Sequence, residues 1–223
     1  MSRILLIGGH GKVALQAAPL LTEAGHEVTS VIRNPEHTHD VEATGATALV
    51  LDVEHADETR LAEAMTGMDA VVFSAGAGAG SAPERTRAVD HDAAIASMRA
   101  AADAGVRRYV MVSYLGASLK HGVPADDPFH TYAQAKAEAD EHLRGTDLDW
   151  TILGPALLTD AEPTGRVTVD PTPAEQGGPA AETSRGNVAR AIVTALAEPA
   201  TVRRQVEFVD GQTPLAQAFG GSR

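Results

Sequence analysis

A tyrosine and a lysine that stand four residues apart are the clearest candidates for chemistry in this chain. Tyr132 and Lys136 fall within a helix predicted over about residues 129–144, so their side chains would lie on one face. A phenol titrates near pH 10, and a neighbouring ammonium favours the phenolate. We therefore expect Lys136 to bring the pKa of Tyr132 toward neutral pH and Tyr132 to exchange a proton with a substrate.

Ser113 stands at the carboxyl end of a strand predicted over 108–113. Sites in α/β sheets assemble where parallel strands end. The Ser113 hydroxyl could hold a substrate carbonyl while Tyr132 protonates it and a nicotinamide delivers hydride. Lys136 could also hydrogen-bond the nicotinamide ribose.

The element that would place a cofactor beside these residues lies near the first residue. Residues 4–7 form an apolar run, typical of a strand buried on both faces, and 12–24 has helical periodicity. A glycine-rich turn joins them. Strand, glycine turn and helix make the phosphate-binding unit of a dinucleotide fold, in which backbone N–H groups and the helix dipole face the pyrophosphate.

The glycines of this turn fit two spacings. Gly9-x-Gly11-x-x-Ala14 matches the general dinucleotide fingerprint, and Gly8-x-x-Gly11-x-x-Ala14 has the wider spacing of short-chain dehydrogenase relatives. In either spacing, backbone can approach phosphate and the small alanine lets the helix sit close to the strand. The side chains of His10 and Lys12 could touch phosphate. The alternative is that both are loop residues exposed to solvent.

Arg33 follows the second predicted strand, 27–32, about 20 residues beyond the glycine turn. NAD-selective folds place an acidic side chain there, on the ribose 2′-hydroxyl. A guanidinium suits a 2′-phosphate instead. The sequence therefore favours NADP(H), with NAD(H) possible, and the alternative is a solvated arginine in a turn.

The next two strands also end in candidate cofactor contacts. The third, 46–51, ends at Asp52, which could accept a hydrogen bond from the adenine amino group or cap a helix predicted over 57–65. The fourth, 69–74, runs into a loop of alternating alanine and glycine. Such a loop lets backbone pass close to a cofactor.

The alternation of strands and helices along the chain predicts an α/β fold: a Rossmann-like, doubly wound parallel sheet with helices on both faces. Further helices are expected over 84–104, 184–198 and 214–219, and further strands over 148–153, 166–169 and 205–209. Gly154-Pro155 would end the strand over 148–153, and Ser184 or Thr183 could cap the helix that runs to about residue 198. We expect a single domain over 1–223, in which 154–185 and 204–223 form a small lobe on the substrate side.

Composition narrows the classes of function. The net charge of −12 disfavours binding to nucleic acid or to an anionic membrane. Cysteine is absent, which excludes disulfides, zinc–thiolate sites and a cysteine nucleophile, and we expect no metal site. Because no stretch approaches the roughly 20 apolar residues of a membrane span, we expect a cytoplasmic protein. We also expect a monomer or homodimer that acts on a small molecule.

The chain resembles the atypical short-chain dehydrogenases/reductases, in the NAD(P)H-binding group near the flavin and biliverdin reductase-like and NmrA-like proteins. The segments IGGHGKVA, VIRNP, LDV, AVVFSAG, RRYVMVS, YAQAKAEAD, LDWTILGPALLT and TSRGNVARAIVTAL carry this resemblance over almost the whole sequence. It implies that Ser113, Tyr132 and Lys136 are the catalytic set. The cofactor contacts that we predict are Gly8, Gly9, His10, Gly11, Lys12, Val13, Arg33, Asp52, Val53, Ser74, Ala75, Gly76, Lys136, Pro155 and Ala156.

Two positions depart from the family pattern. Gly154 stands where relatives usually have arginine, and Asn187 replaces the usual aspartate. Both changes bear on substrate identity more than on fold. Ser118 is a second candidate for the serine role, and Tyr114 could line the pocket at a position where relatives often keep a small residue.

These features predict an NAD(P)H-dependent oxidoreductase that reduces a small carbonyl, quinone or flavin-type substrate. One alternative is a redox-sensing regulator that binds NADP(H) without turnover, although such a sensor needs neither Tyr132 nor Lys136. Another is a nucleotide-sugar epimerase or dehydratase, whose substrate region is usually larger than the roughly 70 residues after Leu153.

Overall fold

Nine strands form one twisted sheet in the computed structural model, which describes residues 1–78, 80–172 and 181–220. Neighbouring strands pair in parallel from β3 through β10, and the last two strands, β8 and β11, pair antiparallel. From one edge to the other, the strands are β11 (Thr213–Pro214), β8 (Arg166–Val169), β10 (Arg204–Asp210), β6 (Asp149–Pro155), β5 (Arg108–Val112), β4 (Ala70–Phe73), β1 (Arg3–Ile7), β2 (Glu27–Ile32) and β3 (Thr47–Val50).

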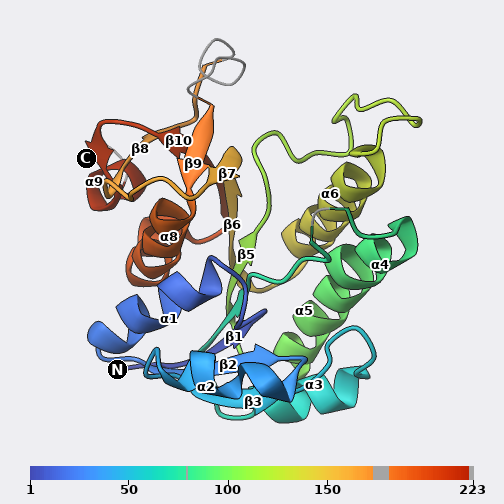
Figure 1. The fold of residues 1–223 in the computed structure, drawn as a ribbon, viewed down its shortest axis with the longest axis vertical. Helices are drawn as coiled ribbons and strands as arrows, with labels where there is room; N and C mark the ends of the chain where they lie inside the picture. Colours follow the sequence, from blue (N-terminus) through green and yellow to red (C-terminus); the bar gives the residue numbers. More distant parts are fainter. Residues whose placement is uncertain (79, 173–180, 221–223) are drawn as a thin grey trace.

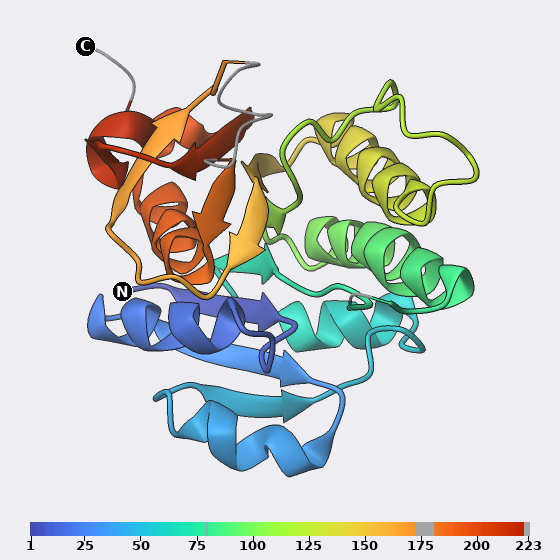
Figure 2. The ribbon, with the colours of Figure 1, turned by 45° about the horizontal axis from the view of Figure 1, so that its top comes forward.

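Helices cover both faces of this sheet, as the doubly wound prediction requires (Figures 1 and 2). One face carries α1 (Ala14–Glu23) and α8 (Arg185–Ala197), which pack against each other. The other face carries α3 (Glu58–Met65), α5 (Ala94–Asp103) and α6 (His130–Arg144). Shorter helices are α2 (Thr38–Glu42), α4 (Pro83–Arg87) and α9 (Leu215–Phe219), with single 3-10 turns at Pro35–His37 and Pro199–Thr201.

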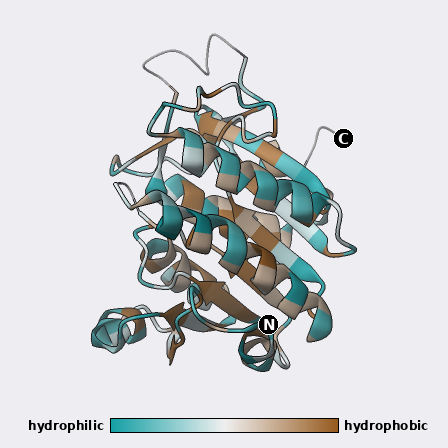
Figure 3. Cartoon of the chain, turned by 90° about the vertical axis from the view of Figure 1, so that its right-hand side faces the viewer, coloured by the Kyte–Doolittle hydropathy of each residue, from teal (hydrophilic) through white to brown (hydrophobic). Residues whose placement is uncertain are grey.

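The first strand shows how the sequence fixes these layers. Ile4 and Leu6 pack into the core beneath α1 and α8, whereas Leu5 and Ile7 pack into the core beneath α3 and α5. All four side chains are buried, so the prediction of a strand covered on both faces is confirmed. Figure 3 shows the same pattern as hydrophobic strands behind helices whose outer sides are hydrophilic.

The structure corrects several expected boundaries. The helix predicted over 84–104 is divided into α4, a π-helical segment at Ala88–Ala93 and α5. β6 continues through Pro155, because that residue pairs with Phe208 of β10 and its carbonyl accepts the Leu115 N–H at 2.8 Å.

A second, two-stranded parallel sheet was not expected. It pairs β7 (Leu157–Thr159) with β9 (Glu182–Ser184) beside the end of β10. Ser184 then caps α8, as predicted, by accepting the Asn187 N–H at 3.2 Å. Within the described parts of the chain, every helix is too short or too polar to traverse a lipid bilayer.

Candidate active site

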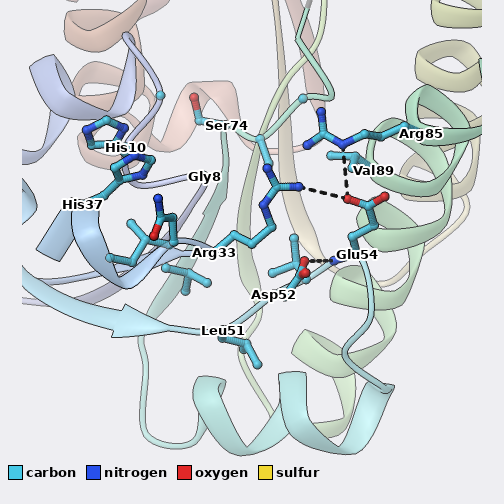
Figure 4. A pocket seen from close by; sticks show the side chains of 17 residues that line it. Gly8, His10, Arg33, His37, Leu51, Asp52, Glu54, Ser74, Arg85 and Val89 are labelled. Atoms are coloured by element: carbon cyan, nitrogen blue, oxygen red, sulfur yellow. Dashed lines mark hydrogen bonds and ion pairs between the residues drawn. The ribbon is translucent and has the colours of Figure 1, made fainter. Parts of the chain in front are cut away.

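A cavity of about 380 Å³ opens where β1, β2, β3 and β4 end (Figure 4). Its walls are the glycine turn after β1, the segments that follow β2 and β3, the loop after β4, and α4 with the π-helical segment. These elements bring together nine of the predicted cofactor contacts: Gly8, His10, Gly11, Arg33, Asp52, Val53, Ser74, Ala75 and Gly76.

The glycine turn is shaped for a close approach of backbone. Gly8 has φ +86°, and a Cβ there would lie 2.7 Å from the Ala75 backbone. The Gly11 N–H closes the turn by donating to the Gly8 carbonyl at 2.8 Å. Val13, at the N-cap of α1, gives the helix no side-chain hydrogen bond, and the Leu15 N–H already donates to the Gly11 carbonyl at 2.9 Å, so what the turn offers a phosphate is close approach of backbone and the positive end of the helix dipole. The turn therefore fits the pyrophosphate of a dinucleotide.

Gly9, unlike Gly8 and Gly11, does not line the cavity. Its N–H donates to the Val31 carbonyl at 2.8 Å, and a Cβ there would lie 2.6 Å from Cβ of Ser30. Gly9 thus lets β1 end tightly against β2 rather than lining the cavity. Other predicted contacts that lie outside the cavity lining are Lys12, Val13, Lys136, Pro155 and Ala156.

His10 and Lys12 leave the turn in different directions. The His10 ring stacks on His37 at 3.6 Å, and its Nε2 lies 3.0 Å from Asp40 Oδ2. The hydrogen bond from His10 lowers the pKa of Asp40. Lys12 Nζ instead pairs with Asp160 at 3.1 Å. Only the histidine of the two therefore faces the cavity, beside His37.

Asp52 shapes the segment after β3 rather than the helix that follows it. Its carboxylate accepts the Glu54 N–H at 3.1 Å and lies 3.0 Å from Nδ1 of His55. The cap of α3 is Asp57, which accepts the Arg60 N–H at 2.8 Å. The capping alternative for Asp52 is therefore wrong, and its carboxylate lies at the cavity wall.

Two of the predicted catalytic residues, Ser113 and Lys136, lie at the carboxyl end of β5. Ser113 is buried there, and its Oγ donates to Asp140 Oδ2 of α6 at 2.5 Å. Lys136, on the same helix, is buried and donates from Nζ to the Val112 carbonyl at 2.7 Å. Ser113, Lys136 and Asp140 thus form one buried polar cluster between β5 and α6.

Tyr132 packs its ring against two other aromatic rings. Its centroid lies 5.6 Å from Tyr114 and 5.2 Å from Phe129. Burial raises the pKa of Tyr132, and the nearby carboxylates of Asp90 and Asp140 raise it further. The expected lowering by Lys136 is therefore not found in this structure. Tyr132 is protonated at neutral pH, which suits a proton donor and not a base.

Asp90 connects this cluster to the cavity. It lies in the π-helical segment, is buried, and accepts the Ala77 N–H at 2.9 Å. Burial raises the pKa of Asp90, whereas the charge of Lys136 opposes that rise. The neighbouring Val89 lines the cavity. One carboxylate thus holds the loop after β4 and faces the ammonium of the candidate catalytic lysine.

Asp140 should make the stability of the protein fall as pH rises. Burial raises the pKa of Asp140 to about 6, against the opposing effects of Lys136, Ser113 and Arg144. A carboxyl with a higher pKa in the folded state binds protons more tightly when folded, so its stabilising effect is lost between about pH 4 and 6. The loss is on the order of 3 kcal/mol.

Urea unfolding from pH 4.5 to 7.5 tests this prediction. The free energy of unfolding of the wild type should fall relative to that of Asp140→Asn as pH rises. Asp103→Asn, which removes an exposed carboxylate at the end of α5, is the control and should track the wild type. A difference in unfolding free energy between the wild type and Asp140→Asn that stays constant with pH would contradict the raised pKa.

The two departures from the family pattern have structural reasons. A Cβ at Gly154 would lie 3.2 Å from the Tyr114 carbonyl oxygen, so glycine lets β6 and the segment after β5 run close together. Asn187 is buried; it accepts the Gly165 N–H at 2.8 Å and donates to Asp210 at 2.7 Å. Asn187 therefore ties α8 to β10 and to the turn before β8.

Ser118, the second candidate for the serine role, lies in the loop between β5 and α6. Its Oγ accepts the Lys120 N–H at 3.3 Å. Ser113, in contrast, contacts the carboxylate that also faces Lys136. The structure thus groups Ser113, and not Ser118, with the buried charges of α6.

Residues of this region that sequence reasoning missed include His37, Glu54, Arg85, Val89, Asp90 and Asp140. Asp140 could have been found from its spacing, because it follows Lys136 by four residues and therefore lies on the same face of the helix. Asp90 does not stand out in the sequence, because Arg87 and Asp92 carry charge in the same helical stretch. The pairing of Glu54 with Arg85 joins segments that are 31 residues apart, and no local pattern reports it.

Comparison with known proteins agrees with this geometry. A sequence model described as NAD(P)H-binding matches residues 8–199. The Bacillus subtilis protein YhfK, named an uncharacterized sugar epimerase, is 32% identical over 97% of this chain and 98% of its own length. A solved Bacillus halodurans structure, whose name proposes an NAD-dependent epimerase/dehydratase, has a TM-score of 0.87 and 32% identity over 97% of each chain.

The same fold is found in the Lactococcus lactis oxidoreductase YlbE, with a TM-score of 0.84 and 24% identity over 97% of this chain and 94% of that one. The Rossmann-like prediction is thereby confirmed. By the family match over most of its length, the chain belongs to the NAD(P)H-binding family.

Proposed function

We propose that this protein is an NADP(H)-dependent reductase of a small carbonyl, quinone or flavin-type substrate. The observation that carries the proposal is the meeting of the glycine turn, Arg33 and the loop after β4 around one cavity. Asp90 links that cavity to the cluster of Ser113, Lys136 and Asp140. A cofactor that fills the cavity would point its reactive end toward this cluster.

The residues have complementary roles in the proposed reaction. NADPH, when bound, supplies the hydride. Tyr132 donates the proton that the reduced carbonyl oxygen takes up, since burial keeps its phenol protonated. Lys136 holds the ribose and balances the carboxylates around it, and Ser113 positions the substrate oxygen. Hydride and proton together convert a carbonyl to an alcohol.

A substrate screen tests this function. Purified protein with NADPH would be assayed for cofactor oxidation with aldehydes, ketones, quinones and free flavins. We expect one of these classes to be reduced catalytically. Tight cofactor binding without turnover of any class would favour the redox-sensing alternative instead.

The names of two relatives support a second candidate, epimerisation of a nucleotide-linked sugar. Including UDP-sugars in the same screen separates the two functions, because an epimerase interconverts sugars with no net consumption of NADPH.

Arg33 should set the preference for the phosphorylated cofactor. Its guanidinium is more than half exposed at the end of β2, where a 2′-phosphate could reach it. We expect wild type to bind NADPH about 10- to 100-fold more tightly than NADH, as a charge-assisted pair provides. Arg33→Ala should abolish most of this difference. Calorimetric titration of both cofactors measures it, and equal wild-type affinities would contradict the role of Arg33.

A further inference from the structure

Glu54 lies between two arginines at the wall of the cavity (Figure 4). Its Oε2 atom is 3.4 Å from Nη1 of Arg33 and 3.4 Å from Nε of Arg85. The carboxylate is largely buried, with 15% of its side chain exposed, whereas Arg33 is 56% exposed. The three side chains come from three walls: the end of β2, the segment after β3, and α4.

The two contacts of Glu54 are weak for ion pairs. Both end on the same oxygen, and 3.4 Å is well beyond the roughly 2.7–2.9 Å of a good charge-assisted hydrogen bond. Arg85 is held more firmly by the protein itself, since its Nη1 donates to the Ala77 carbonyl at 2.7 Å. Arg85 is thus fixed in place, and its Nε faces Glu54.

A phosphate monoester would be a stronger partner for these arginines than Glu54. It carries about −1.5 to −2 charges at neutral pH and three acceptor oxygens, against one charge on a carboxylate. Two guanidiniums that already share one anion need only modest movement to share another. Glu54 cannot remain between them when such a phosphate binds, because like charges at contact distance repel.

We propose that Arg33 and Arg85 together form the subsite for the 2′-phosphate of NADP(H), and that Glu54 competes with this phosphate and so limits the preference for NADP(H). This inference rests on the proposed function and adds a second arginine and an opposing carboxylate to it. Without ligand, Glu54 keeps the two cations close together. With the phosphorylated cofactor bound, Glu54 is displaced, and this displacement weakens binding.

Glu54→Gln separates the competing charge from the shape of the side chain. We expect it to tighten NADPH and the fragment 2′,5′-ADP about tenfold, while NADH and 5′-AMP change by less than about threefold. Arg85→Ala should weaken NADPH and 2′,5′-ADP about tenfold and leave NADH and 5′-AMP nearly unchanged. Glu63→Gln is the matched control, because Glu63 pairs with Arg60 at 3.0 Å outside the cavity.

Isothermal titration of all four ligands distinguishes the outcomes. NADPH binding that neither Glu54→Gln nor Arg85→Ala alters relative to NADH would overturn the inference and leave the proposed function standing. Loss of NADH affinity in Glu54→Gln, with NADPH unchanged, would also overturn it, because Glu54 would then be accepting the ribose hydroxyl. If wild type binds neither cofactor nor 2′,5′-ADP, the proposed function and the inference both fail.

Discussion

Gly11→Val is expected to abolish NADPH binding while leaving the fold intact. Gly11 lines the cavity, and a Cβ there would already lie 3.1 Å from the Gly8 carbonyl oxygen that closes the turn. The two additional methyl groups of valine would crowd the space in which backbone meets the pyrophosphate. We expect the Kd for NADPH to rise about 100-fold or more, equivalent to a loss of about 3 kcal/mol.

The control for this variant is the same substitution at another exposed glycine. Gly145, at the C-cap of α6, has φ −79°, which a β-branched residue can adopt. Gly145→Val should bind NADPH like the wild type. Calorimetry gives the affinities, and thermal unfolding checks that both variants remain folded. Wild-type affinity in Gly11→Val would mean that the cofactor phosphates bind elsewhere.

Tyr132→Phe should lower kcat for a carbonyl substrate by about 100-fold or more and change NADPH affinity by less than about threefold. Phenylalanine preserves the packing against Tyr114 and Phe129, so the substitution removes only the hydroxyl. Since the pKa of this hydroxyl is raised by burial, the wild-type rate should stay constant across neutral pH rather than follow ionisation of the phenol.

Tyr109→Phe is the matched control for this prediction. Tyr109 is fully buried in the core, where its hydroxyl lies 2.6 Å from Ser97 Oγ, so its loss should reduce stability and leave kcat unchanged. Steady-state kinetics with the best carbonyl substrate compares the three proteins. A wild-type kcat in Tyr132→Phe would contradict the role of Tyr132 as proton donor. A loss confined to carbonyls, with quinone or flavin reduction retained, would indicate direct hydride transfer to those substrates.

Much of the fold could be predicted because its signals are local. The apolar run 4–7, the glycine turn and the alternation of strands and helices each depend on neighbouring residues, and each corresponds to an element of the structure. The short β7–β9 pair and α2 escaped prediction because segments of three to five residues have too little periodicity to read. The π-helical segment also gives no pattern, since it changes the winding and not the composition of the helix.

The candidate site was predictable only in part, for a related reason. The glycines of the turn after β1 and Arg33 after β2 can be recognised because each follows directly on a predicted strand, and this position can be read from the sequence. The charges that surround Lys136 arise from tertiary packing: Asp90 comes from the π-helical segment, and Asp140 meets Ser113 across 27 positions of sequence. Burial of Tyr132 itself, together with these two carboxylates, reverses the expected direction for the pKa of Tyr132, which the spacing of Tyr132 and Lys136 alone could not reveal.

Calorimetric titration of NADPH into the wild-type protein tests most directly whether the cavity at the ends of β1 to β4 is a dinucleotide site. We expect saturable binding of one NADPH per chain with a Kd of about 100 µM or tighter, and weaker binding of NADH. The titration should be repeated with Gly11→Val and with Gly145→Val, of which only the second should bind. The absence of saturable binding of either cofactor to the wild type at millimolar concentration would contradict a dinucleotide site in this cavity.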